Sequence, residues 1–177
     1  MKYQEAIKKS MEMIAEDEKS VFIGYNISYG SKAYGTLKDI PDSKKIETPV
    51  TENLMMGLAM GMSLEGFRPI VFFERHDFML IALDAIVNHL DKFEVMSNGQ
   101  YKLPVIIRAT VGSKKPLDPG PQHTQDHSEI LKNIVKYIKV YEPKTPKEIL
   151  EIYEKIRNTD SPVIIIERRD LYNIEEN

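Results

Sequence analysis

The first candidate for chemistry is a single carboxylate, Glu52, near the head of the segment TPVTENLMMGLAMGMSLEG (residues 48–66). A carboxylate at a helix N-terminus is favoured by the helix dipole and the free N–H groups, so Glu52 can be an ordinary helix-start residue. The residues that follow are apolar or small, and Gly57 and Gly61 stand four apart, which lets another backbone approach closely. This pattern predicts a helix buried on most sides, with a subunit contact as one explanation. A partly desolvated carboxyl group at its head can give or accept a proton.

Two histidines form the second candidate, in the loop KKPLDPGPQHTQDHSE (residues 114–129). His123 and His127 are four apart, so on a helix they could share a metal ion. Gly120 and Pro121 come directly before His123 and favour a loop there, and no glutamate completes an H-E-x-x-H pattern. The alternative is that a turn presents His123 to a cleft as an acid, a base or a hydrogen-bond donor.

Aromatic residues form the third candidate, in the segment FFERHDFM (residues 72–79). Phe72 and Phe73 fit the core of a strand. Phe78 follows a polar interruption, at a predicted strand-to-helix turn, where an aromatic ring can stack on a flat ligand. Packing in the core is the plainer explanation for such a residue.

The composition limits the class of protein. The 177 residues carry a net charge of −3, with 42% hydrophobic and 29% charged residues, and they include no cysteine. These values are ordinary for a globular domain and argue against a nucleic-acid-binding surface, a disulfide scaffold or thiolate chemistry. No apolar run approaches the ~20 residues that span a bilayer. We therefore expect one cytoplasmic domain over residues 1–177, without nucleic-acid or membrane partners.

Apolar strand-like runs and helical patterns alternate along the chain. The predicted strands cover residues 20–24, 69–73, 104–110, 138–141 and 162–167, and the predicted helices cover residues 3–17, 52–64, 78–96, 128–133 and 146–157. Continuous apolar strands separated by helices predict a three-layer α/β/α fold with a mostly parallel sheet covered on both faces. Ligands of such folds gather beyond the carboxyl ends of the strands, so the segments after residues 24, 73 and 110 should meet there.

Polar side chains interrupt the long predicted helix at residues 78–96. Asp84, Asn88 and Asp91 lie on one face of it. They can form a solvated face, or they can make buried hydrogen bonds that fix a loop or a subunit contact. The sequence favours neither.

These segments together resemble a known family. The stretch ETPVTENLMMGLAMGMSLEGFRPIVFF (residues 47–73) resembles the pyrimidine-binding domain of transketolase-like thiamine diphosphate enzymes, and most of all the beta subunit of pyruvate-dehydrogenase-type 2-oxo acid dehydrogenases. The features shared are threonine-proline, a glutamate three residues after the proline, spaced small residues, and G-x-R-P before a strand. Further matches keep their order along the chain: Phe78, DAIVN (residues 84–88), Met96-Ser97 with Gly99, PVIIR (residues 104–108), QHTQ (residues 122–125) and the strand at residues 162–167.

The resemblance implies roles for five residues. Glu52 matches the glutamate that shares a proton with a ring nitrogen of the cofactor's aminopyrimidine, and Phe78 matches the aromatic residue that packs on this ring. His123 matches the histidine near the reactive carbon and the substrate. His76 and Gln122 are further candidates for the substrate side. The implied cofactor is thiamine diphosphate, with no metal ligand from this chain.

The resemblance also implies partners. The chain has no G-x-x-x-x-G-K-[ST] or G-x-G-x-x-G loop and no GDG, so it has no phosphate cradle of these types. In the enzymes it resembles, the diphosphate and Mg²⁺ are held by another domain. We therefore expect an alpha-type partner subunit in an assembly based on a homodimer or heterotetramer. The C-terminal domain typical of beta subunits lies outside residues 1–177, and a separate chain can supply it.

Two places in the sequence depart from the family pattern and leave the substrate unidentified. Tyr25 and Asn26 follow the first strand, where the family often has an acidic residue, and His76 stands where an aromatic residue is common. The leading hypothesis is a pyrimidine-side subunit of a split enzyme acting on a 2-oxo acid or a ketose, which includes a transketolase-type ketol transferase or a carboligase. The alternatives are a non-catalytic assembly or regulatory module and a metal-binding protein using His123 and His127.

Overall fold

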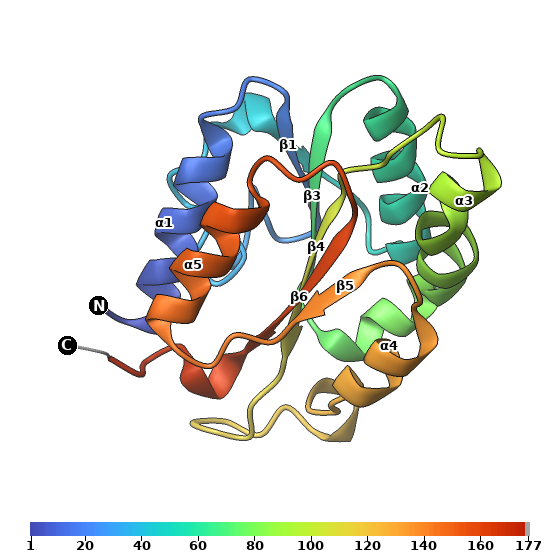
Figure 1. Ribbon diagram of the computed structural model, residues 1–177. Helices are drawn as coiled ribbons and strands as arrows, with labels where there is room; N and C mark the ends of the chain where they lie inside the picture. Colours follow the sequence, from blue (N-terminus) through green and yellow to red (C-terminus); the bar gives the residue numbers. More distant parts are fainter. Residues whose placement is uncertain (176–177) are drawn as a thin grey trace.

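The computed structural model describes residues 1–175, and within them six strands form one parallel sheet. Its order is β2-β1-β3-β4-β6-β5, and all five neighbouring pairs are parallel. The strands are β1 (Ser20–Gly24), β2 (Lys45–Glu47), β3 (Arg68–Phe73), β4 (Ile106–Val111), β5 (Lys139–Tyr141) and β6 (Val163–Arg168). This confirms the predicted α/β fold (Figure 1).

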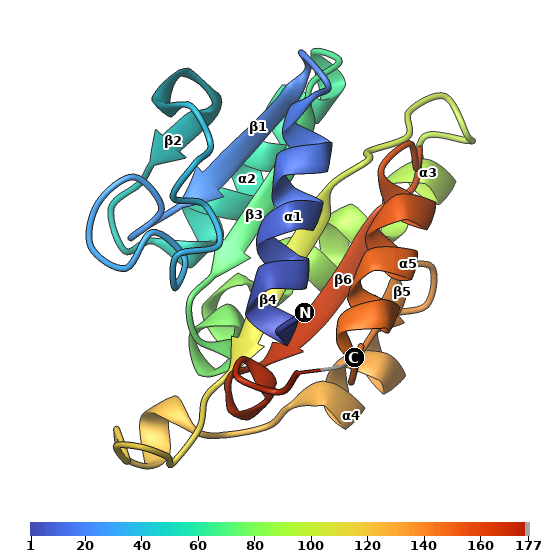
Figure 2. The same ribbon diagram turned by 90° about the vertical axis from the view of Figure 1, so that its left-hand side faces the viewer.

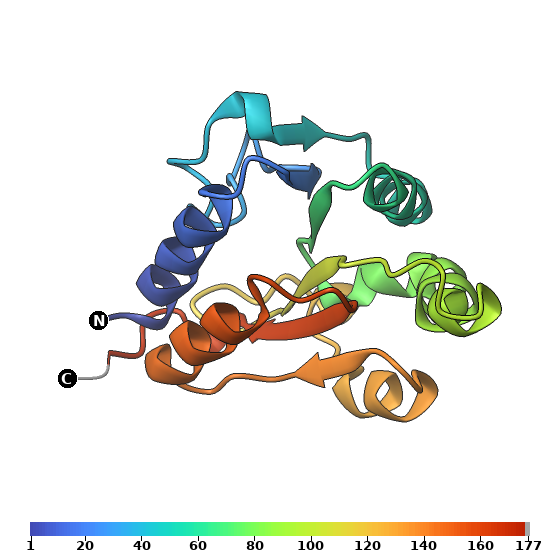
Figure 3. The same cartoon turned by 45° about the horizontal axis from the view of Figure 1, so that its top comes forward.

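Helices cover both faces of the sheet, which gives the predicted three layers (Figure 3). One face carries α1 (Tyr3–Ala15) and α5 (Pro146–Ile156), and the other carries α2 (Glu52–Leu64), α3 (Phe93–Met96) and α4 (Ser128–Ile134). No helix within residues 1–175 is both long enough and apolar enough to cross a bilayer.

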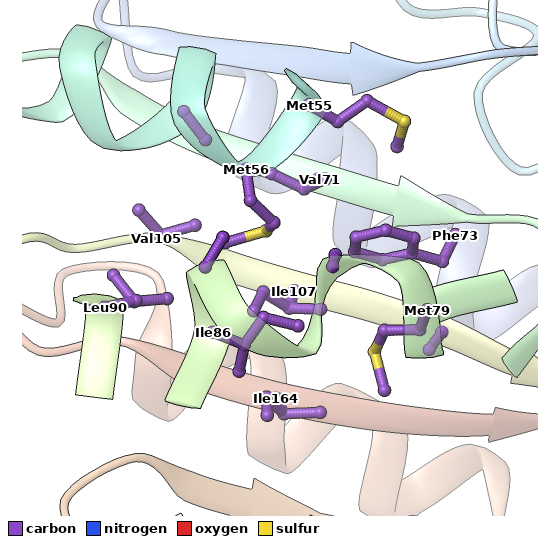
Figure 4. Packing of buried hydrophobic residues seen from close by; sticks show 14 of the residues in the cluster. Met55, Met56, Val71, Phe73, Met79, Ile86, Leu90, Val105, Ile107 and Ile164 are labelled. Atoms are coloured by element: carbon purple, nitrogen blue, oxygen red, sulfur yellow. The ribbon is translucent and has the colours of Figure 1, made fainter. Parts of the chain in front are cut away.

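Alternate side chains of each strand enter two separate cores, because successive residues of a strand point to opposite faces. On the α2 side, Met55 and Met56 join Val71, Phe73 and Ile107 in one buried cluster (Figure 4). On the α1 and α5 side, the neighbouring strand residues, such as Phe72 and Ile106, join the second cluster. Both Phe72 and Phe73 are therefore core residues, as the sequence indicates.

The prediction of one long helix over residues 78–96 is wrong. The chain forms a 3₁₀ helix, η2 (His76–Ala82), a π-helical segment (Ala85–His89), a further 3₁₀ turn and then α3. Asp91 is buried and accepts hydrogen bonds from the backbone N–H groups of residues 136–138, whereas Asp84 accepts one from Asn88 at the surface. Because Asp91 is bound to another segment, the chain here does not follow one straight α-helix.

Two other local predictions need correction. The strand β2 lies at residues 45–47, where the sequence predicts no strand, and its half-buried residues show no periodicity. Helix α2 begins and ends as predicted, at residues 52 and 64, and the hydroxyl of the preceding Thr51 donates to the carbonyl of Pro49. The helix is not buried on most sides, because one face, with Gly57 and Gly61, is exposed.

Candidate active site

The segments that follow β1, β3 and β4 gather at one edge of the sheet, beyond the carboxyl ends of the strands (Figure 2). In a parallel sheet this edge is the usual place for a ligand. The loop after β4 extends past the edge, and it carries the η5 turn (Pro121–His123). Helix α2 begins after β2 at the same end of the sheet, which brings Glu52 to this edge.

Glu52 is buried, with 2% of its surface exposed, although it is the first residue of α2. The hydroxyl of Tyr25, the residue directly after β1, donates a hydrogen bond to Glu52 Oε1 at 3.2 Å. Burial, together with the charge and hydrogen bond of Glu52, raises the pKa of Tyr25 well above its usual value, so the phenol stays protonated and donates to Glu52. Within residues 1–175, this is the one hydrogen bond seen to the Glu52 carboxyl group, and it leaves Oε2 without a partner.

Phe78 and His123 lie together at the same edge. Their ring centroids are 5.2 Å apart and the rings are nearly perpendicular, at 86°. Phe78 belongs to η2, which packs against α2 on one side and contacts the η5 turn on the other. The structure therefore brings the elements that carry Glu52, Phe78 and His123 into contact through η2.

His76 and Gln122 occupy different environments. His76 is fully buried, and its ring lies edge-on to that of His127 with centroids 5.8 Å apart. Burial lowers the pKa of His76 to about 4, so this imidazole is neutral near pH 7. Gln122 is exposed on the η5 turn. A role of either residue toward a substrate stays a prediction.

The geometry counts against the metal alternative. His123 and His127 pack against different aromatic partners, Phe78 and His76. Within the described residues, no three His, Cys, Asp or Glu side chains are placed to hold a metal ion. A pocket of about 700 Å³ between α1 and α5 lies on the other face of the sheet, and none of the candidate side chains lines it.

Two residues that fix this edge were not singled out from the sequence. Asp77 is buried and accepts two hydrogen bonds from Gln125, one from its backbone N–H at 3.1 Å and one from its side chain at 2.9 Å. Gly112 follows β4, and a Cβ atom there would lie 1.8 Å from the carbonyl oxygen of His123. A glycine directly after a buried strand was the one available signal of this close approach.

Substituting Gly112 by alanine is expected to displace the η5 turn, because a contact of 1.8 Å with a backbone atom cannot be relieved by a rotamer change. We expect a loss of about 1–3 kcal/mol in the free energy of unfolding. The His123 ring resonances should also lose the ring-current shift caused by Phe78. Urea unfolding and NMR of the chain measure the two effects.

Gly57→Ala is the matched control for this experiment. A Cβ atom at Gly57 meets nothing within 4 Å, and the residue lies inside a helix. This variant should be as stable as the parent or more stable by up to about 1 kcal/mol. Equal stability of the Gly112→Ala and Gly57→Ala variants would contradict the close approach of His123.

The fold and this edge together define a class of protein, an α/β domain with a parallel sheet and a buried carboxylate at the head of a helix beside the strand ends. The chain belongs to the transketolase pyrimidine-binding domain family, whose model matches residues 1–175. This domain is the pyrimidine-binding part of transketolase-like thiamine diphosphate enzymes, so the family resemblance seen in the sequence is confirmed.

Curated relatives and solved structures agree with this family. The chain is 32% identical over 174 residues to the pyruvate dehydrogenase E1 component subunit beta of Rickettsia conorii, and 30% identical over 177 residues to the mitochondrial subunit of Saccharomyces cerevisiae. These alignments cover 96% and 97% of this chain but 52% and 48% of the relatives, so the chain spans about half of their length.

Two solved structures share the fold. A split-gene transketolase, described as an inactive beta4 tetramer, has a TM-score of 0.66 at 23% identity, covering 99% of this chain and 53% of that one. The transketolase of Campylobacter jejuni has a TM-score of 0.75 at 15% identity, covering 98% of this chain and 26% of that one.

The residues at the edge fit an aminopyrimidine ring. Glu52 keeps one carboxyl oxygen without a hydrogen-bond partner, which suits a ring nitrogen, and Phe78 offers a half-buried aromatic ring for stacking. The chain therefore fits the pyrimidine end of the cofactor.

Proposed function

We propose that this chain is the pyrimidine-side component of a split, cytoplasmic thiamine diphosphate enzyme that acts on a 2-oxo acid or a ketose. The observation that carries the proposal is Glu52, a buried carboxylate with one free oxygen at the head of α2, in a chain of this family. The half-buried ring of Phe78 on η2 and the imidazole of His123 on η5 support the proposal.

The cofactor, when bound, supplies a thiazolium carbon that adds to the substrate carbonyl and accepts the electrons of the bond that breaks. Glu52 holds and exchanges a proton at the aminopyrimidine ring nitrogen, through its free oxygen. Phe78 packs on the ring and fixes its plane, and His123 can donate a hydrogen bond toward the substrate. With 2% of its surface exposed, Glu52 has little contact with water that could compete for this proton.

A partner chain is part of the proposal. The exposed face of α2 carries Gly57 and Gly61 between Leu54 and Leu64, which are 55% and 45% exposed. A Cβ atom at either glycine would meet nothing within 4 Å, so the chain itself does not use the small residues for close packing. An apolar face with small residues suits a second helix. We assign it to an alpha-type subunit that holds the diphosphate and Mg²⁺.

The test is reconstitution. Mixing the chain with a subunit that carries a diphosphate-binding domain should give a complex that binds thiamine diphosphate and Mg²⁺, measured by calorimetry. Gly61→Leu should weaken the complex about tenfold or more, because a large side chain prevents close helix packing. Exchange of the cofactor C2 proton for deuterium, followed by NMR, then reports whether the complex is active.

Glu151→Leu, an exposed change on α5, is the control and should leave the complex intact. A complex that forms and binds the cofactor but exchanges no C2 proton would contradict the enzymatic proposal, and it would favour a non-catalytic assembly module. A complex equally tight with the Gly61→Leu chain would contradict the assignment of the α2 face.

A further inference from the structure

The residue after β1 makes a contact that the family pattern does not imply. Tyr25 stands where an acidic residue is common, yet it is 6% exposed and its hydroxyl lies 3.2 Å from Glu52 Oε1. The other charged groups near its phenol are Glu74 and Arg75, both directly after β3. Glu52 is therefore paired with a neutral hydrogen-bond donor rather than with a second carboxylate.

The backbone around Tyr25 is fixed by a carboxylate clamp. Glu47, the last residue of β2, accepts hydrogen bonds from the backbone N–H groups of Asn26 at 2.6 Å, Ile27 at 3.0 Å and Ser28 at 2.7 Å. The Asn26 side chain donates to Glu74 at 2.8 Å. Hydrogen bonds to charged acceptors are among the strongest in proteins, so the clamp holds this turn firmly.

The turn is also packed tightly against β3. Asn26 has a φ of +56°, a left-handed conformation that asparagine tolerates better than most residues. A Cβ atom on Gly24 would lie 2.9 Å from the carbonyl oxygen of Phe72, so the glycine permits this close approach. With its backbone held on both sides, Tyr25 can aim its hydroxyl at Glu52 before any ligand arrives.

A hydroxyl donor has two effects on a carboxylate. It occupies one oxygen and fixes the orientation of the group, and it favours the ionised form over the protonated one. Here Oε1 is the occupied oxygen and Oε2 is the free one. Tyr25 does not act as a base itself, because burial and the Glu52 charge raise the pKa of its phenol and keep it protonated.

We propose that Tyr25 is the positioning residue for Glu52, which holds the carboxylate through Oε1 and leaves Oε2 as the oxygen that exchanges the cofactor's proton. This inference rests on the proposed function of Glu52. It assigns to Tyr25 a task that it performs only through Glu52, without contact with the substrate.

The first test uses the isolated chain, so it does not depend on a partner or a cofactor. In protein labelled with ¹³C at the glutamate carboxyl groups, the Glu52 resonance is identified by its loss in Glu52→Gln. Tyr25→Phe removes one oxygen atom and should shift this resonance at fixed pH, because the hydrogen bond to Oε1 is lost. Tyr29→Phe, at a residue 73% exposed, should leave it unchanged. An unaltered resonance in Tyr25→Phe would overturn the inference.

The second test uses the reconstituted enzyme. Tyr25→Phe should slow C2–H exchange about tenfold, in keeping with one hydrogen bond to a charged group, and displace its pH profile upward. An unshifted profile in a variant whose resonance has moved would overturn the functional part of the inference. If instead Glu52→Gln exchanges normally, the proposed function fails, whatever the resonance of Glu52 shows. The two failures are thus distinguishable.

Discussion

Glu52→Gln is expected to slow exchange of the C2 proton of thiamine diphosphate about 100-fold or more in the reconstituted enzyme, while the chain still folds. Glutamine has the shape of glutamate and can still accept the Tyr25 hydrogen bond at its oxygen. It cannot give or take a proton, and a positioned acid or base contributes typically about 10²–10⁴-fold to a rate.

The measurement is deuterium exchange at C2 of the cofactor, quenched with acid and read by NMR, at a saturating concentration of thiamine diphosphate. Saturation separates a loss of proton exchange from a loss of binding. Glu65→Gln, at the exposed C-terminal end of the same helix, changes the charge by the same amount and should exchange at the parent rate. Equal rates for the parent and the Glu52→Gln enzyme would contradict the role of Glu52.

The elements with a strong local signal could be predicted from the sequence. The run SVFIG and the apolar strands after proline are continuous because both faces of the sheet are covered, and α2 spans the predicted residues 52–64. The segment at residues 76–96 could not be predicted. Its path depends on contacts such as the hydrogen bonds that Asp91 accepts from the backbone N–H groups of residues 136–138, which lie far away in the sequence.

The candidate site likewise contains residues that the sequence predicts and residues that it does not. An ordered set of sequence motifs was enough to single out Glu52, Phe78 and His123 as candidates. The structure places the elements that carry these three residues in contact. In the sequence, Tyr25 stood out only as a departure from the family pattern. Its proposed role depends on a hydrogen bond to Glu52, which lies 27 positions away. Likewise, Gly112 is required because the carbonyl oxygen of His123 lies where a Cβ atom would be. Such contacts depend on how the loops return to the edge of the sheet, and local patterns do not encode that.

The largest effect on stability is expected at a buried ion pair between β4 and β6, on the face covered by α1 and α5. Arg108 and Glu167 are both 0% exposed, with hydrogen bonds of 2.8 and 3.0 Å between the guanidinium and the two carboxyl oxygens. The hydroxyls of Tyr153 and Tyr172 donate to the same oxygens at 3.1 and 3.0 Å. Thr36 accepts a further hydrogen bond from Arg108 at 3.1 Å.

Glu167→Gln should destabilise the chain by about 3–5 kcal/mol, because it leaves Arg108 as a buried charge without a counter-charge. Burial by itself lowers the pKa of Arg108, but the Glu167 carboxylate outweighs this and raises it, so the guanidinium is charged in the native protein. The variant loses the charge and keeps the shape. Urea unfolding of the isolated chain, followed by circular dichroism, measures the difference.

Two further variants separate the lost pair from lost packing. Asp160→Asn breaks an exposed pair with Lys102 and should leave stability unchanged, because solvent screens such pairs. Arg108→Met combined with Glu167→Leu removes both charges, so it should recover much of the loss seen in Glu167→Gln, although three hydroxyl partners lose their bonds. A double variant less stable than Glu167→Gln would contradict the uncompensated charge as the cause. The hydrogen-bond network around the pair would then be the main source of stability, since the single variant keeps the bond from Arg108 to Thr36 and one amide oxygen that accepts from a tyrosine hydroxyl.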